Sequence, residues 1–144
     1  MNTQTLPRLI PLTDKAKTAI HHDVILISAF PFRLGRESRS SHGDTRKLFE
    51  RRIGKIPPNN DYYLFDTSER LHISREHCRI EENNRGVYTL FDRGSTCGTT
   101  IIHDHRKHHF RFSRHPLEQG DTIILGSPRS PYCFLFQLPE FSRS

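Results

Sequence analysis

Short runs of apolar and alternating residues recur along the chain and are separated by polar turns. They occupy residues 8–12, 24–27, 32–34, 62–65, 78–81, 87–91, 99–102, 110–112, 122–125 and 133–136. Alternation with a period of two residues is typical of strands that bury one face. Roughly ten short strands at this spacing predict an all-β protein, an antiparallel sandwich.

Several segments carry more specific local signals. Residues 24–27 are all apolar, which predicts a buried strand. Pro11 suggests that the strand at residues 8–12 lies at a sheet edge, because proline lacks a backbone N–H. Residues 14–19 fit one helical turn or a plain loop, and the histidine-rich residues 103–109 are expected to form a turn.

The segment from residue 37 to residue 60 has a different character. It is rich in Ser, Arg, Gly and Pro, has no alternating pattern, and residues 36–56 contain seven Lys or Arg and three acidic residues. Connections of this length are usually functional or disordered. We interpret residues 37–60 as a long basic insert in which residues 47–53 fit a short amphipathic helix.

Length and composition favour a single domain spanning residues 1–144, with its core in about residues 6–138. The chain has ten Phe and four Tyr, which favours strands over helices. The formal net charge is +6, which indicates an acidic partner such as a phosphate group, an acidic peptide or a nucleic acid. A role of this charge in solubility alone is the simpler alternative.

The cysteines and the apolar segments bear on the cellular location. Three cysteines at wide, irregular spacing do not suggest a disulfide framework, and Cys78 and Cys133 lie in apolar runs typical of reduced core residues. No stretch approaches the ~18 apolar residues of a membrane span, and the N-terminus does not resemble a signal peptide. We therefore expect a cytoplasmic protein without a membrane partner.

Four motifs follow one another in a fixed order. They are Gly35-Arg36, Ser74-x-x-His77, Asp92-x-Gly94-Ser95-Thr96-x-Gly98-Thr99 and Leu117-x-x-Gly120-Asp121-x-Ile123-x-Leu125-Gly126. Together they resemble the forkhead-associated (FHA) domain, a module that binds phosphothreonine peptides, and Ser-Arg-x-His is the form familiar from bacterial members. The resemblance covers about residues 6–138 and implies a β-sandwich of about eleven strands with the binding loops at one end.

The resemblance also implies a role for individual residues. Arg36 resembles the arginine that contacts the phosphothreonine, and Ser74 the serine that bonds a phosphate oxygen. Arg75 occupies a position where the family often has a phosphate contact, and Thr96 matches a Thr or Ser that lines the site. A phosphothreonine carries about −1.5 to −2 charges and three acceptor oxygens, which suit guanidinium and hydroxyl donors.

Three further residues resemble structural supports of that site. His77 matches a histidine that braces the binding loops without touching the ligand. Gly35 and Gly98 match glycines of structural importance, and Gly98 is expected to supply turn geometry with positive φ.

The chain departs from the family pattern at Cys97. The family usually has an Asn there, which holds the main chain of the peptide beside the phosphothreonine. A thiol does not present an amide donor and acceptor together, so the peptide side of the site is expected to be weakened. A reactive thiol at Cys97, close to Arg93, is a further hypothesis.

These observations favour a binding module in Ser/Thr kinase signalling whose partner is a phosphothreonine-containing protein or peptide. The chain shows no catalytic base, nucleophile pair or nucleotide loop, so we expect neither an enzyme nor a cofactor. One alternative is a scaffold that binds its partner without phosphate. Another is nucleic-acid binding through the insert together with four basic residues in the C-terminal half of the chain, namely Arg106, Lys107, Arg111 and Arg114. No signal for an oligomeric state is evident.

The histidines also raise a zinc hypothesis. Five of them lie close together in the sequence, at His103, His105, His108, His109 and His115. Imidazole is a good zinc ligand, but no cysteine or acidic residue falls at the spacing of a metal finger. We therefore expect no metal.

Overall fold

A computed structural model of the chain describes residues 6–38 and 58–139, which contain eleven strands and one short helix. The elements in chain order are β1 (Arg8–Pro11), α1 (Asp14–Ala19), β2 (Ile25–Leu26), β3 (Phe32–Arg36), β4 (Tyr62–Leu64), β5 (Cys78–Glu82), β6 (Tyr88–Asp92), β7 (Thr99–His103), β8 (Arg106–Phe110), β9 (Arg114–Leu117), β10 (Thr122–Leu125) and β11 (Cys133–Gln137).

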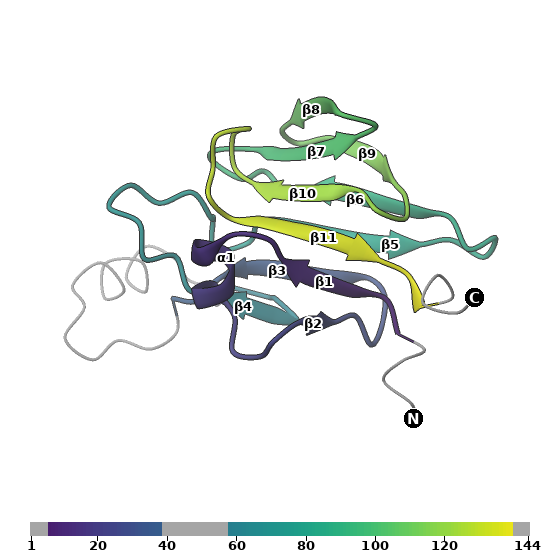
Figure 1. Ribbon diagram of the computed structural model, residues 1–144, viewed down its shortest axis with the longest axis horizontal. Helices are drawn as coiled ribbons and strands as arrows, with labels where there is room; N and C mark the ends of the chain where they lie inside the picture. Colours follow the sequence, from purple (N-terminus) through teal and green to yellow (C-terminus); the bar gives the residue numbers. More distant parts are fainter. Residues whose placement is uncertain (1–5, 39–57, 140–144) are drawn as a thin grey trace.

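The strands form two stacked sheets (Figure 1). The six-stranded sheet has the order β2-β1-β11-β10-β7-β8, and the five-stranded sheet has the order β4-β3-β5-β6-β9. All neighbouring strands are antiparallel except β3 and β4, which are parallel. A parallel pair needs a long crossover, and here residues 37–61 connect the two strands. The predicted β-sandwich of about eleven strands is confirmed.

The core lies between the two sheets and is filled largely by alternate residues of the strands. In β5 the inward residues are Cys78 and Ile80, and in β11 they are Phe134 and Phe136. Tyr132, directly before β11, is fully buried as well. This alternation is the signal from which most of the strands were predictable.

The expected positions of the first two strands were both wrong, because β2 and not β1 lies at the sheet edge. β2 is the edge of its sheet and buries only Ile25 and Ile27 of its apolar run, so the expected burial of the whole run was wrong. β1 lies inside the sheet, between β2 and β11. Pro11 is tolerated there because β2 pairs only with Arg8 and Leu9, so that Pro11 pairs with β11 alone.

The expected turn at residues 103–109 was also wrong, because most of it is strand β8. The chain turns at Asp104 and His105, both with positive φ, and then pairs along β7 from Arg106 to Phe110. β8 is an edge strand whose first four residues are all exposed, so its sequence carries no buried alternation. The expected strand at residues 110–112 ends at Phe110.

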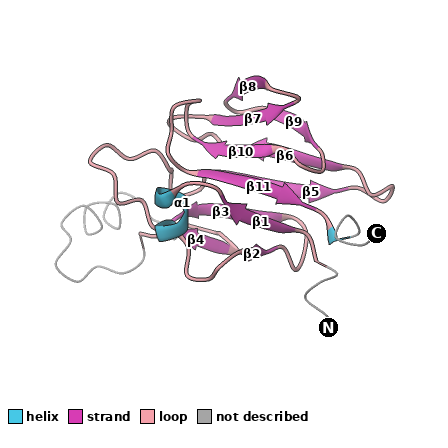
Figure 2. Cartoon of the chain, in the orientation of Figure 1, coloured by secondary structure: helices cyan, strands magenta, loops and turns pink. Residues whose placement is uncertain are grey.

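Residues 14–19 form helix α1, the only helix longer than one turn in the described part of the chain (Figure 2). Thr13 caps it, because its hydroxyl accepts a hydrogen bond from the N–H of Ala16 at 3.2 Å. No helix in residues 6–38 and 58–139 is long and apolar enough to cross a membrane. The expected helix at residues 47–53 lies outside the described residues.

The ends of β3 and β6 and the start of β5 lie on the same side of the sandwich as α1 (Figure 1). The end of β3, the loop that follows β6 and the loop that precedes β5 therefore meet there. They carry three of the four motifs of the sequence, at residues 35–36, 74–77 and 92–99.

Candidate functional site

An open pocket of about 520 Å³ lies among these loops. Its lining residues come from four segments of the chain and are Arg36, Pro58, Ser74, Arg75, Glu76, Arg93, Gly94 and Thr96. Three arginines and two hydroxyls in one pocket make it suitable for an anion with several acceptor oxygens.

Arg36 and Ser74 are held together by the backbone. The N–H of Arg36 donates to the carbonyl of Ser74 at 2.9 Å, and Arg36 Nε donates to the carbonyl of Ile73 at 2.8 Å. Arg36 is only 8% exposed, so its guanidinium is held between strand β3 and the loop before β5. Ser74 Oγ accepts a hydrogen bond from the N–H of Thr96 at 2.8 Å, which joins this loop to the one after β6.

His77 lies beneath the pocket, fully buried, and connects the same two loops. Its Nδ1 accepts a hydrogen bond from the N–H of Ser74 at 3.0 Å, so the proton is on Nε2, which donates to the carbonyl of Gly98 at 2.8 Å. Burial lowers the pKa of His77 to about 4, which keeps the ring neutral near pH 7. His77 does not line the pocket.

Asp92 organises the loop between β6 and β7. Its Oδ2 accepts from the N–H groups of Gly94, Ser95 and Phe112, each at 3.0 Å. Its Oδ1 accepts from the hydroxyls of Ser95 and Thr99 at 2.5 and 2.7 Å. Burial alone would raise the pKa of Asp92, but these hydrogen bonds outweigh it and hold the pKa below its usual value.

Because Asp92 satisfies three backbone N–H groups, the substitution Asp92→Ala is expected to destabilise the protein by about 3 kcal/mol or more. Chemical denaturation at neutral pH measures this loss. Asp23→Ala is the matched control, since Asp23 is exposed, and it should change the free energy of unfolding by less than about 0.5 kcal/mol. An equally small effect of Asp92→Ala would show that the loop does not depend on this carboxylate.

Asp66 has a similar role in the loop between β4 and β5. Its Oδ2 accepts from the N–H groups of His72 and Ile73 at 2.6 and 2.9 Å, and its Oδ1 accepts from the hydroxyl of Tyr132 at 2.9 Å. The hydrogen bonds to Asp66 outweigh burial and lower its pKa. No motif in the sequence marked this residue, and its buried partner Tyr132 lies 66 positions away in the chain.

Gly35 is required by a close crossing of two segments. A Cβ at Gly35 would lie 1.9 Å from the carbonyl oxygen of Arg75 and 2.6 Å from the side-chain amide of Asn60. Gly98 combines positive φ (82°) with crowding, because a Cβ there would lie 2.4 Å from His109 Nε2. Gly35 thus lets the segments at the pocket approach one another, whereas Gly98 lets its loop approach strand β8.

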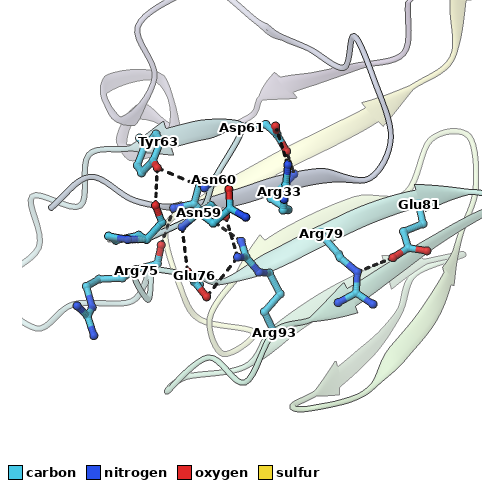
Figure 3. Close-up of polar contacts among 11 residues, drawn as sticks. Arg33, Asn59, Asn60, Asp61, Tyr63, Arg75, Glu76, Arg79, Glu81 and Arg93 are labelled. Atoms are coloured by element: carbon cyan, nitrogen blue, oxygen red, sulfur yellow. Dashed lines mark hydrogen bonds and ion pairs between the residues drawn. The ribbon is translucent and has the colours of Figure 1, made fainter. Parts of the chain in front are cut away.

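Arg93, which the sequence reasoning did not assign to the site, is the central link on one side of the pocket (Figure 3). Its guanidinium donates to Asn60 Oδ1 at 2.7 Å and to the carbonyl of Asn59 at 2.8 Å, and it lies 3.3 Å from Glu76 Oε1. Burial lowers the pKa of Arg93. Glu76 Oε2 in turn accepts from the N–H of Asn59 at 2.9 Å.

This network attaches the end of the predicted insert, residues 58–60, to the pocket. Asn60 Nδ2 also donates to the carbonyl of Arg75 at 2.7 Å. The motif around Asp92 leaves the position of Arg93 unspecified, and Asn59 and Asn60 lie in a segment without a pattern. No sequence signal identified these contacts.

Of the remaining expected site residues, two line the pocket and one does not. Arg75 and Thr96 line the pocket, and the guanidinium of Arg75 points away from Asn59 and Asn60 in Figure 3. Cys97 is half-buried and does not line the pocket, and its Sγ lies 3.6 Å from the carbonyl oxygen of Leu71.

All three cysteines are free. Cys78 is fully buried, and burial raises the pKa of its thiol, whereas Cys133 is only half-buried. Within the described residues, no group of three or more His, Cys, Asp or Glu is placed to hold a metal ion. His103 instead contacts Asp121, with 2.6 Å between Nδ1 and Oδ1, and His109 Nε2 lies 2.9 Å from the carbonyl oxygen of Cys97.

A family model described as the FHA domain matches residues 51–126, slightly more than half of the chain. Among solved structures, the FHA domain of a hypothetical protein from Arabidopsis thaliana is 20% identical with a TM-score of 0.59, covering 94% of this chain and 87% of that one. No significant match was found among curated proteins.

Two further similar structures contain peptides. The N-terminal FHA domain of Rad53p from S. cerevisiae, in complex with a phosphothreonine peptide, is 20% identical with a TM-score of 0.55 and covers 95% of this chain and 96% of that one. EmbR from Mycobacterium tuberculosis, in complex with a low-affinity phosphopeptide, is 19% identical with a TM-score of 0.54. The match covers 93% of this chain but only 24% of EmbR.

Proposed function

The chain belongs to the forkhead-associated domain family, and on that premise we propose that its pocket binds the phosphothreonine of a partner protein in Ser/Thr kinase signalling. The observation that carries the proposal is the convergence of Arg36, Ser74 and Thr96, from the end of β3 and two separate loops, on one open pocket. The proposed contacts are Arg36, Ser74, Arg75 and Thr96, and His77, Gly35 and Gly98 are their supports.

The chemistry of the pocket favours a phosphate over a carboxylate. A phosphate dianion offers three acceptor oxygens and about twice the charge of a carboxylate. Guanidinium forks match that geometry, and each charge-assisted hydrogen bond contributes about 1.5–3 kcal/mol. Among the described residues that line the pocket, Glu76 alone is negatively charged, and it is paired with Arg93.

Cys97 is proposed to alter the peptide side of the site. Its thiol is engaged near Leu71 and offers no amide to the peptide main chain. A loss of one or two neutral hydrogen bonds lowers affinity by roughly tenfold while phosphate binding persists. This is a binding role, and it requires no catalytic group and no cofactor.

A peptide library with a fixed phosphothreonine, a fixed phosphoserine or an unphosphorylated threonine tests the proposal. We expect the phosphothreonine library to bind at least about tenfold more tightly than the unphosphorylated one, because a threonine hydroxyl offers neither the charge nor the acceptor oxygens of a phosphate. Fluorescence anisotropy with library pools measures the ratio. Equal binding of all three pools would favour a scaffold that does not depend on phosphate.

A further inference from the structure

A row of side chains crosses the outer face of the five-stranded sheet beside the pocket. The strand register aligns Arg33 of β3 with Arg79 of β5, Phe91 of β6 and Arg114 of β9. Residues directly opposite each other in antiparallel pairs project from the same face. The guanidinium of Arg79 lies 4.2 Å from the centre of the Phe91 ring, and that of Arg114 lies 6.0 Å from it.

An open hollow of about 610 Å³ lies over the end of this row. It is lined by Arg79, Phe91, Asp92, Arg93, Phe112, Ser113 and Arg114, and we call it the arginine hollow. It adjoins the phosphate pocket, because Arg93 lines both. A single bound peptide is therefore able to contact both.

Phe112 lines the arginine hollow and lies beside Gly94, which lines the phosphate pocket. Its ring lies against Gly94, where an added Cβ would be 2.4 Å from Phe112 Cε1, yet the residue is 76% exposed. Its φ of 52° is unusual for a bulky residue and is maintained by the hydrogen bond from its N–H to Asp92. Backbone strain of this kind is often found at binding sites, and a fixed aromatic ring provides contact area at low entropic cost.

The hollow is positively charged, and part of this charge is not neutralised by acidic residues. The Arg114 side chain has no ion pair or hydrogen bond among the described residues, and Arg79 pairs with Glu81 at 2.5 Å where both side chains are about a third or more exposed. Solvated pairs of this kind contribute little, so that Arg79 remains able to engage a ligand. The one acidic lining residue, Asp92, is buried and occupied by its five hydrogen bonds.

We propose that the arginine hollow binds a second anionic side chain of the same phosphopeptide, either a phosphorylated residue or a carboxylate. This inference rests on the proposed function of the phosphate pocket. Phe91 on β6 and Arg93, directly after that strand, are two residues apart in the sequence, about 7 Å, and an extended peptide advances ~3.3 Å per residue. The second anion therefore lies about two to five residues from the phosphothreonine.

A set of peptides with one phosphothreonine in a neutral sequence tests the proposal. Each derivative carries one phosphoserine or one glutamate, placed at successive positions on either side of the phosphothreonine. At one or more positions we expect a gain in affinity of about fivefold for phosphoserine and about twofold for glutamate at physiological salt. Arg114→Ala should abolish the gain and leave binding of the parent peptide within about twofold, because Arg114 does not line the phosphate pocket.

Arg85→Ala is the matched control. It removes the same charge from the exposed turn at the opposite end of the β5–β6 hairpin and should leave the gain intact. If the parent peptide bound but no second anion improved its affinity, this inference would be overturned and the proposed function would stand. If the gain persisted in both Arg79→Ala and Arg114→Ala, the hollow would be excluded as its source.

Two other outcomes also overturn the inference. A parent peptide that does not bind would overturn it together with the proposed function. Single-stranded DNA that binds more tightly than the doubly anionic peptides, and loses binding in Arg114→Ala, would assign the hollow to nucleic acid instead.

Discussion

Ser74→Ala is expected to weaken binding of a phosphothreonine peptide at least about tenfold while the protein stays folded. The Ser74 hydroxyl accepts from the N–H of Thr96 and keeps its own proton for a ligand oxygen in the pocket. In the proposed binding mode its removal deletes a donor to the phosphate, and it leaves the Thr96 N–H without its acceptor. Isothermal titration with one phosphopeptide measures the change.

Arg36→Ala is expected to have a larger effect than Ser74→Ala, because it removes a positive charge as well as hydrogen bonds. Arg36→Lys restores the charge but neither the planar fork nor the Nε hydrogen bond to Ile73, so it should recover only part of the affinity. Arg36 is buried, and urea denaturation of each variant is needed to separate lost binding from lost stability.

Ser28→Ala is the control for these variants. Ser28 is exposed and precedes β3 at the end of that strand away from Arg36, so affinity and stability should both be unchanged. If Ser74→Ala and Arg36→Lys both bound the phosphopeptide as tightly as the parent protein, the pocket would not be the phosphate site.

The strands that the sequence predicted best are those with one buried face. In β5, β6 and β11, inward apolar residues alternate with outward ones, and the alternation marks each strand within one or two residues. β8 was missed because an exposed edge strand has no buried face to impose a pattern. Its placement depends on pairing with β7, which a local pattern does not encode.

In the candidate site, too, residues in local motifs were predictable and residues that depend on long-range contacts were not. Arg36, Ser74 and Thr96 were named from motifs that resemble a family, and all three line one pocket. Arg93 and Asn60 were missed because their importance arises from a contact between segments 33 positions apart. That contact depends on where the chain returns after residue 57, and neither residue type in isolation signals it.

Acidification is expected to destabilise the protein through His77. The ring is neutral and buried in the folded state, where burial lowers its pKa to about 4, whereas the unfolded chain titrates near 6.5. As the pH falls below about 6.5, the unfolded state takes up the proton first. The stabilising contribution of His77 is therefore complete above this pH and is lost progressively toward pH 4, by up to about 3 kcal/mol.

Other groups titrate outside this window or with the opposite sign. Asp66 and Asp92 have lowered pKa values, so that their contributions are lost only at more acidic pH. His103 has a raised pKa because of its hydrogen bond to Asp121, so its contribution is present at low pH and declines as the pH rises. A comparison between variants that keep these groups isolates the effect of His77.

His77→Asn provides that comparison. It should be less stable at neutral pH, because Asn does not span the distance between the Ser74 N–H and the Gly98 carbonyl, but its free energy of unfolding should vary much less between about pH 7 and pH 5. The exposed His105 serves as the control, and His105→Asn should keep the pH dependence of the parent protein. Urea denaturation at several pH values measures both profiles. If the parent protein and His77→Asn showed the same slope, the acid sensitivity would have a different origin. A steeper slope in the parent would establish that the loops carrying Ser74 and Gly98 are joined by a neutral imidazole.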